Sequence, residues 1–332
     1  MKQIIICSLA LTATAGTFLL VGGCPAPSRR KPVLVDRQDE SIKLALKFTP
    51  AESTTYRVVL ETGKRVQWEG QAPRPKGFKG GHSSNKMEMT FSQRIEKVGE
   101  QGNAVARITI EGLKYATTII DKSVLDFDST KEKDESHLLN KLIGQNYTIE
   151  ITPSGQVSRV VDANDALAAV SGNETAVALL SAQAIKQRHT IPALPATGEN
   201  QLQSGDNWSN IKSVSFDMMG AKSFERIYTL GRIEDAAGHR IAIVKMEAVP
   251  SAEKAKESHK EQAATDSFSS MFDNTEDYMG ELKFDLTEGK VTQYNENLVV
   301  RWLIVNPNPK DDEPPAALRM TATRLFNIER MD

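Results

Sequence analysis

Cysteine is nearly absent from this sequence. The 332 residues include two, Cys7 and Cys24, too few for a disulfide framework or a zinc site built from cysteine pairs. Aromatic residues are also scarce, at 6%, whereas 39% of the residues are hydrophobic, which is enough for a substantial core. The net charge of −2 argues against the clustered basic surface of a nucleic-acid-binding protein. We therefore expect a globular protein whose partners do not include nucleic acid.

Long apolar runs are absent after the first 23 residues, so no later segment is expected to span a membrane. At the N-terminus, Lys2 precedes an apolar run from Ile4 to Val21, and small residues follow it, which is the pattern of a secretory signal. The segment Leu20-Val21-Gly22-Gly23 before Cys24 resembles a bacterial lipobox, in which the cysteine is acylated and becomes the first residue. An uncleaved transmembrane helix is the alternative interpretation.

These features predict an exported protein held at a membrane and facing the periplasm or the cell exterior. Residues 1–23 are expected to be a signal peptide and residues 24–43 a lipidated tether, with Cys24 as the lipidation site. The basic cluster Arg29-Arg30-Lys31 belongs to this tether. The membrane is therefore the first expected partner.

Short segments with alternating apolar and polar residues dominate the exported part. This period of two predicts strands, and the glycine-containing turns between them predict hairpins. The nine segments are Thr55–Leu60, Met87–Ile95, Ala104–Ile110, Tyr147–Ile151, Phe224–Leu230, Arg240–Met246, Leu282–Leu286, Val299–Val305 and Met320–Phe326. The expected fold is mainly β, a curved antiparallel sheet or half-barrel.

One segment has helical periodicity instead. Apolar residues spaced by three, four and seven positions between residues 162 and 189 predict two short helices, with Asp162 and Asn173 as N-caps. This helical segment, residues 161–198, is expected to pack against the sheet between a first β half at 44–160 and a second at 199–332.

Three connections are expected to be long polar loops: Lys64–Lys86, Pro250–Tyr278 and Asn306–Pro315. The second of them, about residues 250–278, is so rich in charge and serine that we predict a disordered insert.

The two β halves show signs of an internal duplication. Their similar segments follow one another in the same order, with an offset of 134 to 138 positions, as two diverged copies would require. The clearest pairs are Arg94–Glu96 with Arg232–Glu234, Ala106 with Ala242, and Ile149–Thr152 with Phe284–Thr287. The sheets of the two copies are expected to merge into one.

Catalytic motifs are largely missing. The segment Val124–Thr130 fits the pattern of haloacid-dehalogenase-type phosphatases, with Asp126 as nucleophile and Asp128 as acid/base, and Asp311-Asp312 resembles its magnesium-binding pair. That chemistry requires a doubly wound parallel sheet, so we treat it as a remote alternative. No two histidines have the spacing of a zinc pair. We expect no catalytic activity, no metal and no cofactor.

An apolar stripe in the helical segment is the main candidate for ligand binding. As part of the core it would only stabilise the fold; facing a concave sheet it would line an apolar cavity suited to an acyl chain. The stripe consists of Leu167, Val170, Val177, Leu180 and Ile185.

Several structural motifs resemble an uncharacterised family of bacterial exported lipoproteins, known as a domain of unknown function. They are the lipobox, the Leu46–Tyr56 opening, the Met87–Tyr115 and Tyr147–Val161 hairpins and Gly205-Asp206-Asn207-Trp208. The resemblance implies no catalytic residues. The expected layout is also similar to the half-barrels of LolA-like lipoprotein carriers, which shelter acyl chains.

The favoured hypothesis is a non-catalytic, membrane-anchored envelope lipoprotein that binds a lipid or acyl chain in an apolar cavity. The alternative is a structural or interaction lipoprotein that binds an envelope protein. The first predicts a cavity of several hundred Å³, and the second predicts a filled core with an exposed apolar patch or sheet edge.

Overall fold

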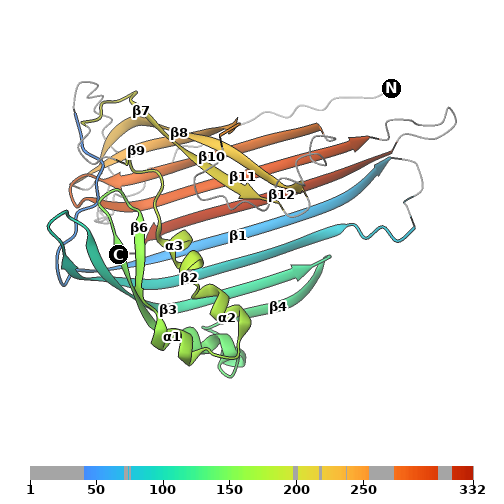
Figure 1. The fold of residues 1–332 in the computed structure, drawn as a ribbon, viewed down its shortest axis with the longest axis horizontal. Helices are drawn as coiled ribbons and strands as arrows, with labels where there is room; N and C mark the ends of the chain where they lie inside the picture. The colour runs from blue at the N-terminus through green and yellow to red at the C-terminus, as the bar shows by residue number, and fades with distance from the viewer. Residues whose placement is uncertain are drawn as a thin grey trace, which may run out of the picture. The chain divides into compact units, whose positions relative to one another are not determined.

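A single antiparallel sheet of twelve strands organises the computed structural model (Figure 1). The structure describes residues 41–70, 74, 76–196, 201–216, 219–236, 238–253, 273–305 and 316–331. The strands of the first half are β1 (Ser53–Gly70), β2 (Gly81–Val98), β3 (Ala104–Ile119), β4 (Lys122–Asp128), β5 (Asn146–Ile151) and β6 (Val157–Asp162). Those of the second half are β7 (Asn207–Ser215), β8 (Ala221–Ala236), β9 (His239–Ser251), β10 (Asp273–Asp285), β11 (Lys290–Val305) and β12 (Ala316–Arg330). The expected fold class is confirmed.

The two halves join at one seam, where β1 pairs with β12. The strand order is β6-β5-β3-β2-β1-β12-β11-β10-β9-β8-β7, and β4 pairs with β3 outside this path. The register is continuous along the seam, from Tyr56 opposite Arg330 to Gly70 opposite Ala316. The first strand of the chain therefore links both halves into one hydrogen-bonded sheet.

The strand order and register agree with the predicted duplication. In the first half Ile95 pairs with Ala106, which pairs with Ile149. In the second half Ile233 pairs with Ala242, which pairs with Phe284. These are the residues that the sequence comparison aligned, so each half is a meander of five strands with the same register at its centre. The β4 hairpin is an addition in the first half, and β12 is an addition in the second.

Three helices connect the halves, where two were predicted. They are α1 (Asn164–Ala169), α2 (Glu174–Leu179) and α3 (Ala182–His189), and two short 3₁₀ helices, η1 (Glu132–Asp134) and η2 (Leu138–Leu142), follow β4. Asn173 caps α2 as predicted, and Ser181 begins a third helix by accepting a hydrogen bond from the Ala184 N–H. Ala163 holds the N-cap position of α1, one residue after the predicted Asp162, but the Asp162 carboxylate accepts the Asn164 N–H at 3.0 Å at the start of this helix.

The predicted loop at residues 64–86 is wrong over most of its length. Residues 64–70 continue β1 and residues 81–86 begin β2. These strand ends are polar because their side chains are at most partly buried, so the alternation that marks a half-buried strand is weak there. Of the predicted disordered insert, the two ends lie in β9 and β10, and residues 254–272 fall outside the described residues. The predicted loop at 306–315 also falls outside them.

The core lies on one face of the sheet, under α1, α2 and α3 in the first half (Figure 1). The helices contact β5, β6 and η2. Among the described residues, no helix combines the length and apolarity needed to cross a membrane.

Candidate functional site

The predicted apolar stripe belongs mostly to the core. Val170, Leu180 and Ile185 are buried in the main hydrophobic cluster, and Leu167 packs against it. Val177 is 39% exposed, so its predicted position facing the interior is wrong. The second predicted helix ran across the break at Ser181, and placing Val177 on one face with Leu180 and Ile185 assumed that this helix was continuous.

A small cavity lies beside the C-terminus of α3. Its volume is about 50 Å³, and its lining combines apolar side chains with His189, Lys290 and Glu52. Lys290 forms an ion pair with Glu52 and donates to the Thr54 hydroxyl at 3.2 Å. None of the five stripe residues lines this cavity. Ligand pockets occupy about 300 to 1,000 Å³, so this space suits water molecules rather than an acyl chain.

His189 ends a buried hydrogen-bond chain at the same place. The Arg188 guanidinium donates to the Tyr147 hydroxyl at 2.9 Å, and this hydroxyl lies 2.6 Å from the Nε2 atom of His189. Burial, reinforced by the positive charge of Arg188, holds the pKa of His189 well below its usual range. His189 is therefore neutral in the folded protein, with the Tyr147 hydroxyl donating to its Nε2.

A second polar cluster is buried in the other half. Glu296 Oε2 accepts hydrogen bonds from Arg226 at 3.0 Å and from the hydroxyls of Tyr278 and Tyr294, each at 2.9 Å. Arg226 also donates to Asn210 on β7. Burial, and then the negative charge of Glu296, raise the pKa of both tyrosines. This cluster ties β7, β8, β10 and β11 together, and Glu296 Oε2 accepts three internal hydrogen bonds.

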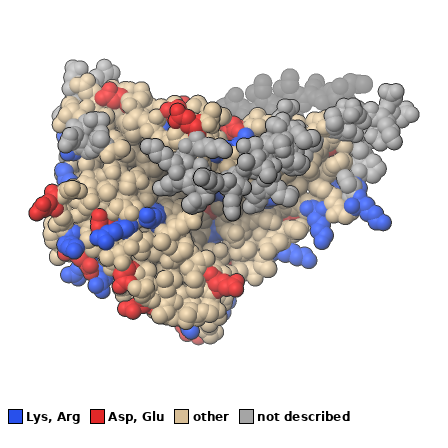
Figure 2. All heavy atoms as spheres, in the orientation of Figure 1, with Lys and Arg blue, Asp and Glu red and all other residues tan. Residues whose placement is uncertain are grey.

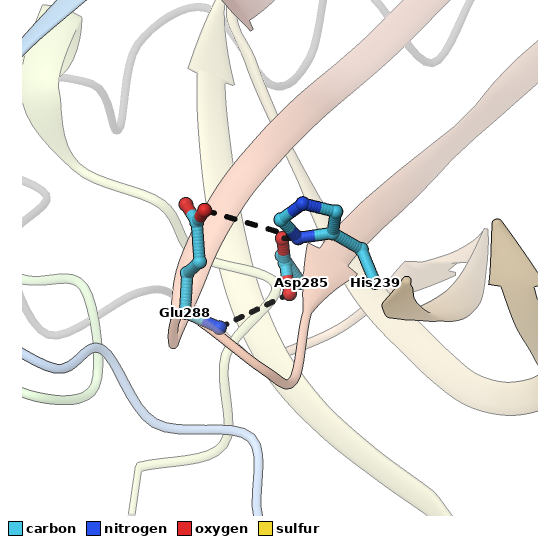
Figure 3. Close-up of side chains that lie close together, drawn as sticks. All are labelled: His239, Asp285 and Glu288. Carbon is cyan, nitrogen blue, oxygen red and sulfur yellow. Dashed lines mark hydrogen bonds and ion pairs between the residues drawn. The ribbon is translucent and has the colours of Figure 1, made fainter. Parts of the chain in front are cut away.

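The candidate metal-binding group is His239, at the start of β9, with Asp285 and Glu288 at the turn between β10 and β11 (Figure 3). One ligand atom from each lies within 4.8 Å of the others. The Nδ1 atom of His239 is 2.7 Å from Asp285 Oδ2, which is a hydrogen-bond distance, and Glu288 forms an ion pair with Arg330. The second oxygen of Asp285 accepts the backbone N–H groups of Thr287 and Glu288. All three side chains thus have partners that hold the turn.

The first half contains the counterpart of this group without a histidine. Asn103 follows Gly102 as His239 follows Gly238, and Glu150 follows Ile149 as Asp285 follows Phe284. The Asn103 amide lies 3.5 Å from a carboxylate oxygen of Glu150. A polar pair across these strands is therefore common to both copies, and we assign it a structural role.

The phosphatase-like motif has the wrong framework. Asp126 is exposed on β4 and Asp128 ends that strand, but every strand pair in the described sheet is antiparallel. Asp128 accepts hydrogen bonds from the hydroxyl and backbone N–H of Thr130, at 2.7 and 3.0 Å, and these bonds lower its pKa. It therefore closes a turn. Asp311 and Asp312, like Cys24, fall outside the described residues.

The β3–β4 turn exposes a group of large aliphatic side chains. Ile119, Ile120 and Val124 are 52%, 43% and 61% exposed, so three large aliphatic side chains meet water within six residues. Ile120 and Asp121 form the turn with φ of +47° and +63°. A β-branched residue in this left-handed region is a conformational outlier, since two-residue hairpin turns of this kind favour Asn-Gly. We call residues 119–124 the apolar tip.

Hydrogen bonds to the start of β2 hold the apolar tip in place. Ile120 N–H donates to the Ser83 hydroxyl at 3.0 Å, and Asp121 N–H donates to the His82 carbonyl at 2.8 Å. In return, His82 N–H donates to the Asp121 carboxylate at 3.1 Å. Gly81 leaves room for this contact, because a Cβ there would lie 2.7 Å from Asp121 Oδ2. These contacts therefore hold the strained turn in one conformation.

Basic and aromatic residues occur in the chain segment that leads to Gly81, which approaches Ile120 and Asp121 of the apolar tip. Lys76, Lys79 and Lys122 are exposed, and the sequence from Gly70 to Lys86 contains no acidic residue. Figure 2 shows basic side chains at the end of the sheet where β1 and β2 reach their connection, and Glu69 on β1 and Asp121 in the β3–β4 turn are acidic residues at this end. Trp68 and Phe78 lie next to this region, with ring centroids 6.1 Å apart.

The sequence analysis missed the apolar tip. Ile119-Ile120 continues the apolar pattern of β3, and nothing in that pattern shows that the chain reverses at Ile120. The signal in the sequence was the short distance between the apolar segments of β3 and β4, because it leaves room only for a tight turn.

Comparisons with known proteins identify no family. No family model matches the chain, and no curated protein matches it. A solved structure described as lipid-protein interactions in lipovitellin is similar with a TM-score of 0.38 and 10% identity, covering 86% of this chain and 26% of that one. This chain thus spans about a quarter of the lipovitellin chain. DynF, from the dynemicin biosynthesis pathway of Micromonospora chersina, has a TM-score of 0.20 and 9% identity, covering 93% of this chain and 94% of that one. Because both TM-scores lie below 0.5, neither similarity bears on the function.

Proposed function

We propose that this protein is a non-catalytic, lipid-anchored protein of the cell envelope that acts by binding through the apolar tip of its sheet. Cys24 would carry the anchor, as the lipobox and the resemblance to exported lipoproteins suggest. The chain from Ser41 onward would be the binding module, facing the periplasm or the cell exterior.

The observation that carries this proposal is the combination of strain and exposure at Ile120. An isoleucine in a left-handed turn strains the backbone, and its exposed side chain places apolar surface in water. The contacts with Ser83 and His82 hold the residue in this position. Such a feature is expected where an apolar side chain must be presented to a partner.

The rival hypothesis, an acyl chain enclosed under the helices, has less support. It needs a cavity of several hundred Å³, whereas the space beside His189 is about 50 Å³ and the stripe residues Val170, Leu180 and Ile185 fill the core. Binding of lipid at the surface is compatible with the proposal.

The anchor is tested by following the mature protein in cells that make the wild type or Cys24→Ala. We expect the wild type to incorporate labelled fatty acid and to fractionate with membranes. Cys24→Ala should incorporate none and should leave an uncleaved precursor or be released. A Cys24→Ala protein that is still processed and labelled like the wild type would refute lipidation at this residue.

A further inference from the structure

We propose that the apolar tip inserts into a lipid bilayer surface that carries anionic headgroups. This inference rests on the proposed position of the protein at a membrane, and it identifies what the tip binds. The bilayer is favoured over a protein partner by the chemistry around the tip.

The apolar part has the composition of a membrane-inserting edge. Ile119, Ile120 and Val124 project from one hairpin end, where they can leave water without a conformational change in the sheet. Exposed aliphatic side chains gain free energy on transfer to the acyl boundary in proportion to their area. Trp68, near the end of β1, contacts Phe78 with ring centroids 6.1 Å apart, and tryptophan is enriched where a protein meets the headgroup level of a bilayer.

The charged part matches anionic headgroups. Lys76, Lys79 and Lys122 are exposed beside the tip. Asp121 within the turn accepts the His82 N–H and keeps its negative charge, so the three lysines outnumber one carboxylate among these residues. Each lysine near an anionic membrane surface strengthens binding by about fivefold. A groove for a protein would need complementary polar contacts, whereas aliphatic residues with a basic rim suit the interface of a bilayer.

The predicted anchor allows this contact. The 17 residues from Cys24 to Ser41 reach at most about 60 Å when extended, which is about the length of the 18-residue strand β1. The described chain enters at the end of the sheet where β1 begins, since Leu46 and Lys47 bond to the turns at Pro153 and Gly289. A tether of this reach lets tip and anchor meet the same membrane.

The test is sedimentation of the chain from Val33 onward with vesicles of phosphatidylcholine, alone or with about one-third phosphatidylglycerol. This chain lacks Cys24 and the basic cluster of the tether, yet it keeps every described core residue, the first of which is Ile42. Binding is therefore measured independently of lipidation, and a failure of the anchor and a failure of the tip are distinguishable.

Three variants separate the contributions to binding. Ile119→Ser/Val124→Ser removes apolar area from the tip, and Lys76→Gln/Lys79→Gln/Lys122→Gln removes charge. Val249→Ser/Met279→Ser is the matched control, because it replaces exposed apolar residues on β9 and β10, away from the tip. Thermal unfolding of each variant checks that the fold is intact.

We expect the wild type to bind the anionic vesicles, and less strongly at high salt. The apolar variant should bind at least tenfold more weakly, the charge variant should lose most of its preference for the anionic vesicles, and the control should bind like the wild type. Absence of binding, or binding that both tip variants retain, would overturn the inference. A folded chain that ignores both kinds of vesicle would assign the tip to a protein partner.

Discussion

The conformation of a single residue, Ile120, distinguishes a site from an ordinary turn. Asparagine tolerates the left-handed region, whereas isoleucine is strained there. Ile120→Asn is therefore expected to raise the free energy of unfolding by about 1 kcal/mol, although it removes an apolar side chain. Urea denaturation measures this change.

The neighbouring position provides the control. Ile119 lies in β3 and has no left-handed φ, so Ile119→Asn should leave the stability unchanged or lower it. If Ile120→Asn also lowers the stability, Ile120 is not strained and the argument for its selection at the tip fails.

The buried imidazole of His189 predicts how stability changes with pH. Its pKa is lowered in the folded protein, by burial first and by Arg188 second, so the unfolded chain binds a proton more readily. The stability from this group is complete above about pH 6.5 and is lost as the pH falls. Between pH 7 and pH 5 we expect the free energy of unfolding to fall because of His189, by at most about 2 kcal/mol from this group.

Urea titrations at both pH values test this expectation. His189→Gln should show a smaller fall than the wild type, because the variant has no titrating group at this place. Phe91→Leu alters a ring that contacts the same imidazole and should lower the stability equally at both pH values. If the free energy of unfolding of His189→Gln falls as steeply as that of the wild type, the pH dependence does not come from His189.

At the scale of elements, the sequence predicts strands well where one face is buried. Each strand longer than ten residues overlaps one of the nine predicted segments, because apolar residues alternate in part of it, as in Val58, Leu60 and their neighbours on β1. The shorter strands β4, β6 and β7 contain none of the nine segments. The outer ends of β1 and β2 were missed, since residues that stay partly exposed give no alternation. The three helices were read as two because Ser181 caps a helix within an apolar pattern that continues across it.

The candidate site was less predictable than the strands. A stripe such as Val170, Leu180 and Ile185 marks burial, but it does not tell whether a side chain faces a cavity or a packed core. The apolar tip depends on the φ of Ile120 and on contacts with β2, 37 residues away along the chain. Neither this backbone angle nor these long-range contacts can be predicted from local periodicity.

The close packing of β10 against its neighbouring strands requires glycine at position 280. It pairs with Glu296 on β11 and with Met246 on β9, and a Cβ there would collide with the backbone oxygen of Asn295. We expect Gly280→Ala to lower the free energy of unfolding by about 1 to 3 kcal/mol, because the strands must separate. Thermal or urea denaturation measures the change.

Gly99→Ala is the comparison for Gly280→Ala. The nearest atom to a Cβ at Gly99 is the Asn103 oxygen at 3.7 Å, an ordinary contact. This variant should lie within about 0.5 kcal/mol of the wild type, as expected for a substitution without a clash. Equal effects at both glycines would show that the strands at Gly280 can shift without cost.

For the whole molecule, the seam between β1 and β12 makes two repeated halves into one unit. A row of buried residues crosses it, from Met89 on β2 through Val58 on β1 and Ile328 on β12 to Tyr294 on β11. The duplication was visible in the sequence, but this joint was not, since the β12 strand that makes it has no counterpart in the first copy. Packing across the seam couples the copies.

This coupling predicts that a destabilising substitution in one half lowers the stability of the other half equally. Met89 is fully buried in the first half, so Met89→Ala should lower the free energy of unfolding by about 2 to 5 kcal/mol. In a Trp68→Phe background, which removes the tryptophan of the first half, Trp208 and Trp302 report on the second half by fluorescence, while far-ultraviolet circular dichroism reports on the entire sheet. We expect both signals to show one transition at the same, lowered urea concentration, because unfolding either half exposes the Val58–Ile328 row. If the fluorescence transition stays at the wild-type midpoint while the dichroism transition splits, the halves unfold separately and the seam does not couple them.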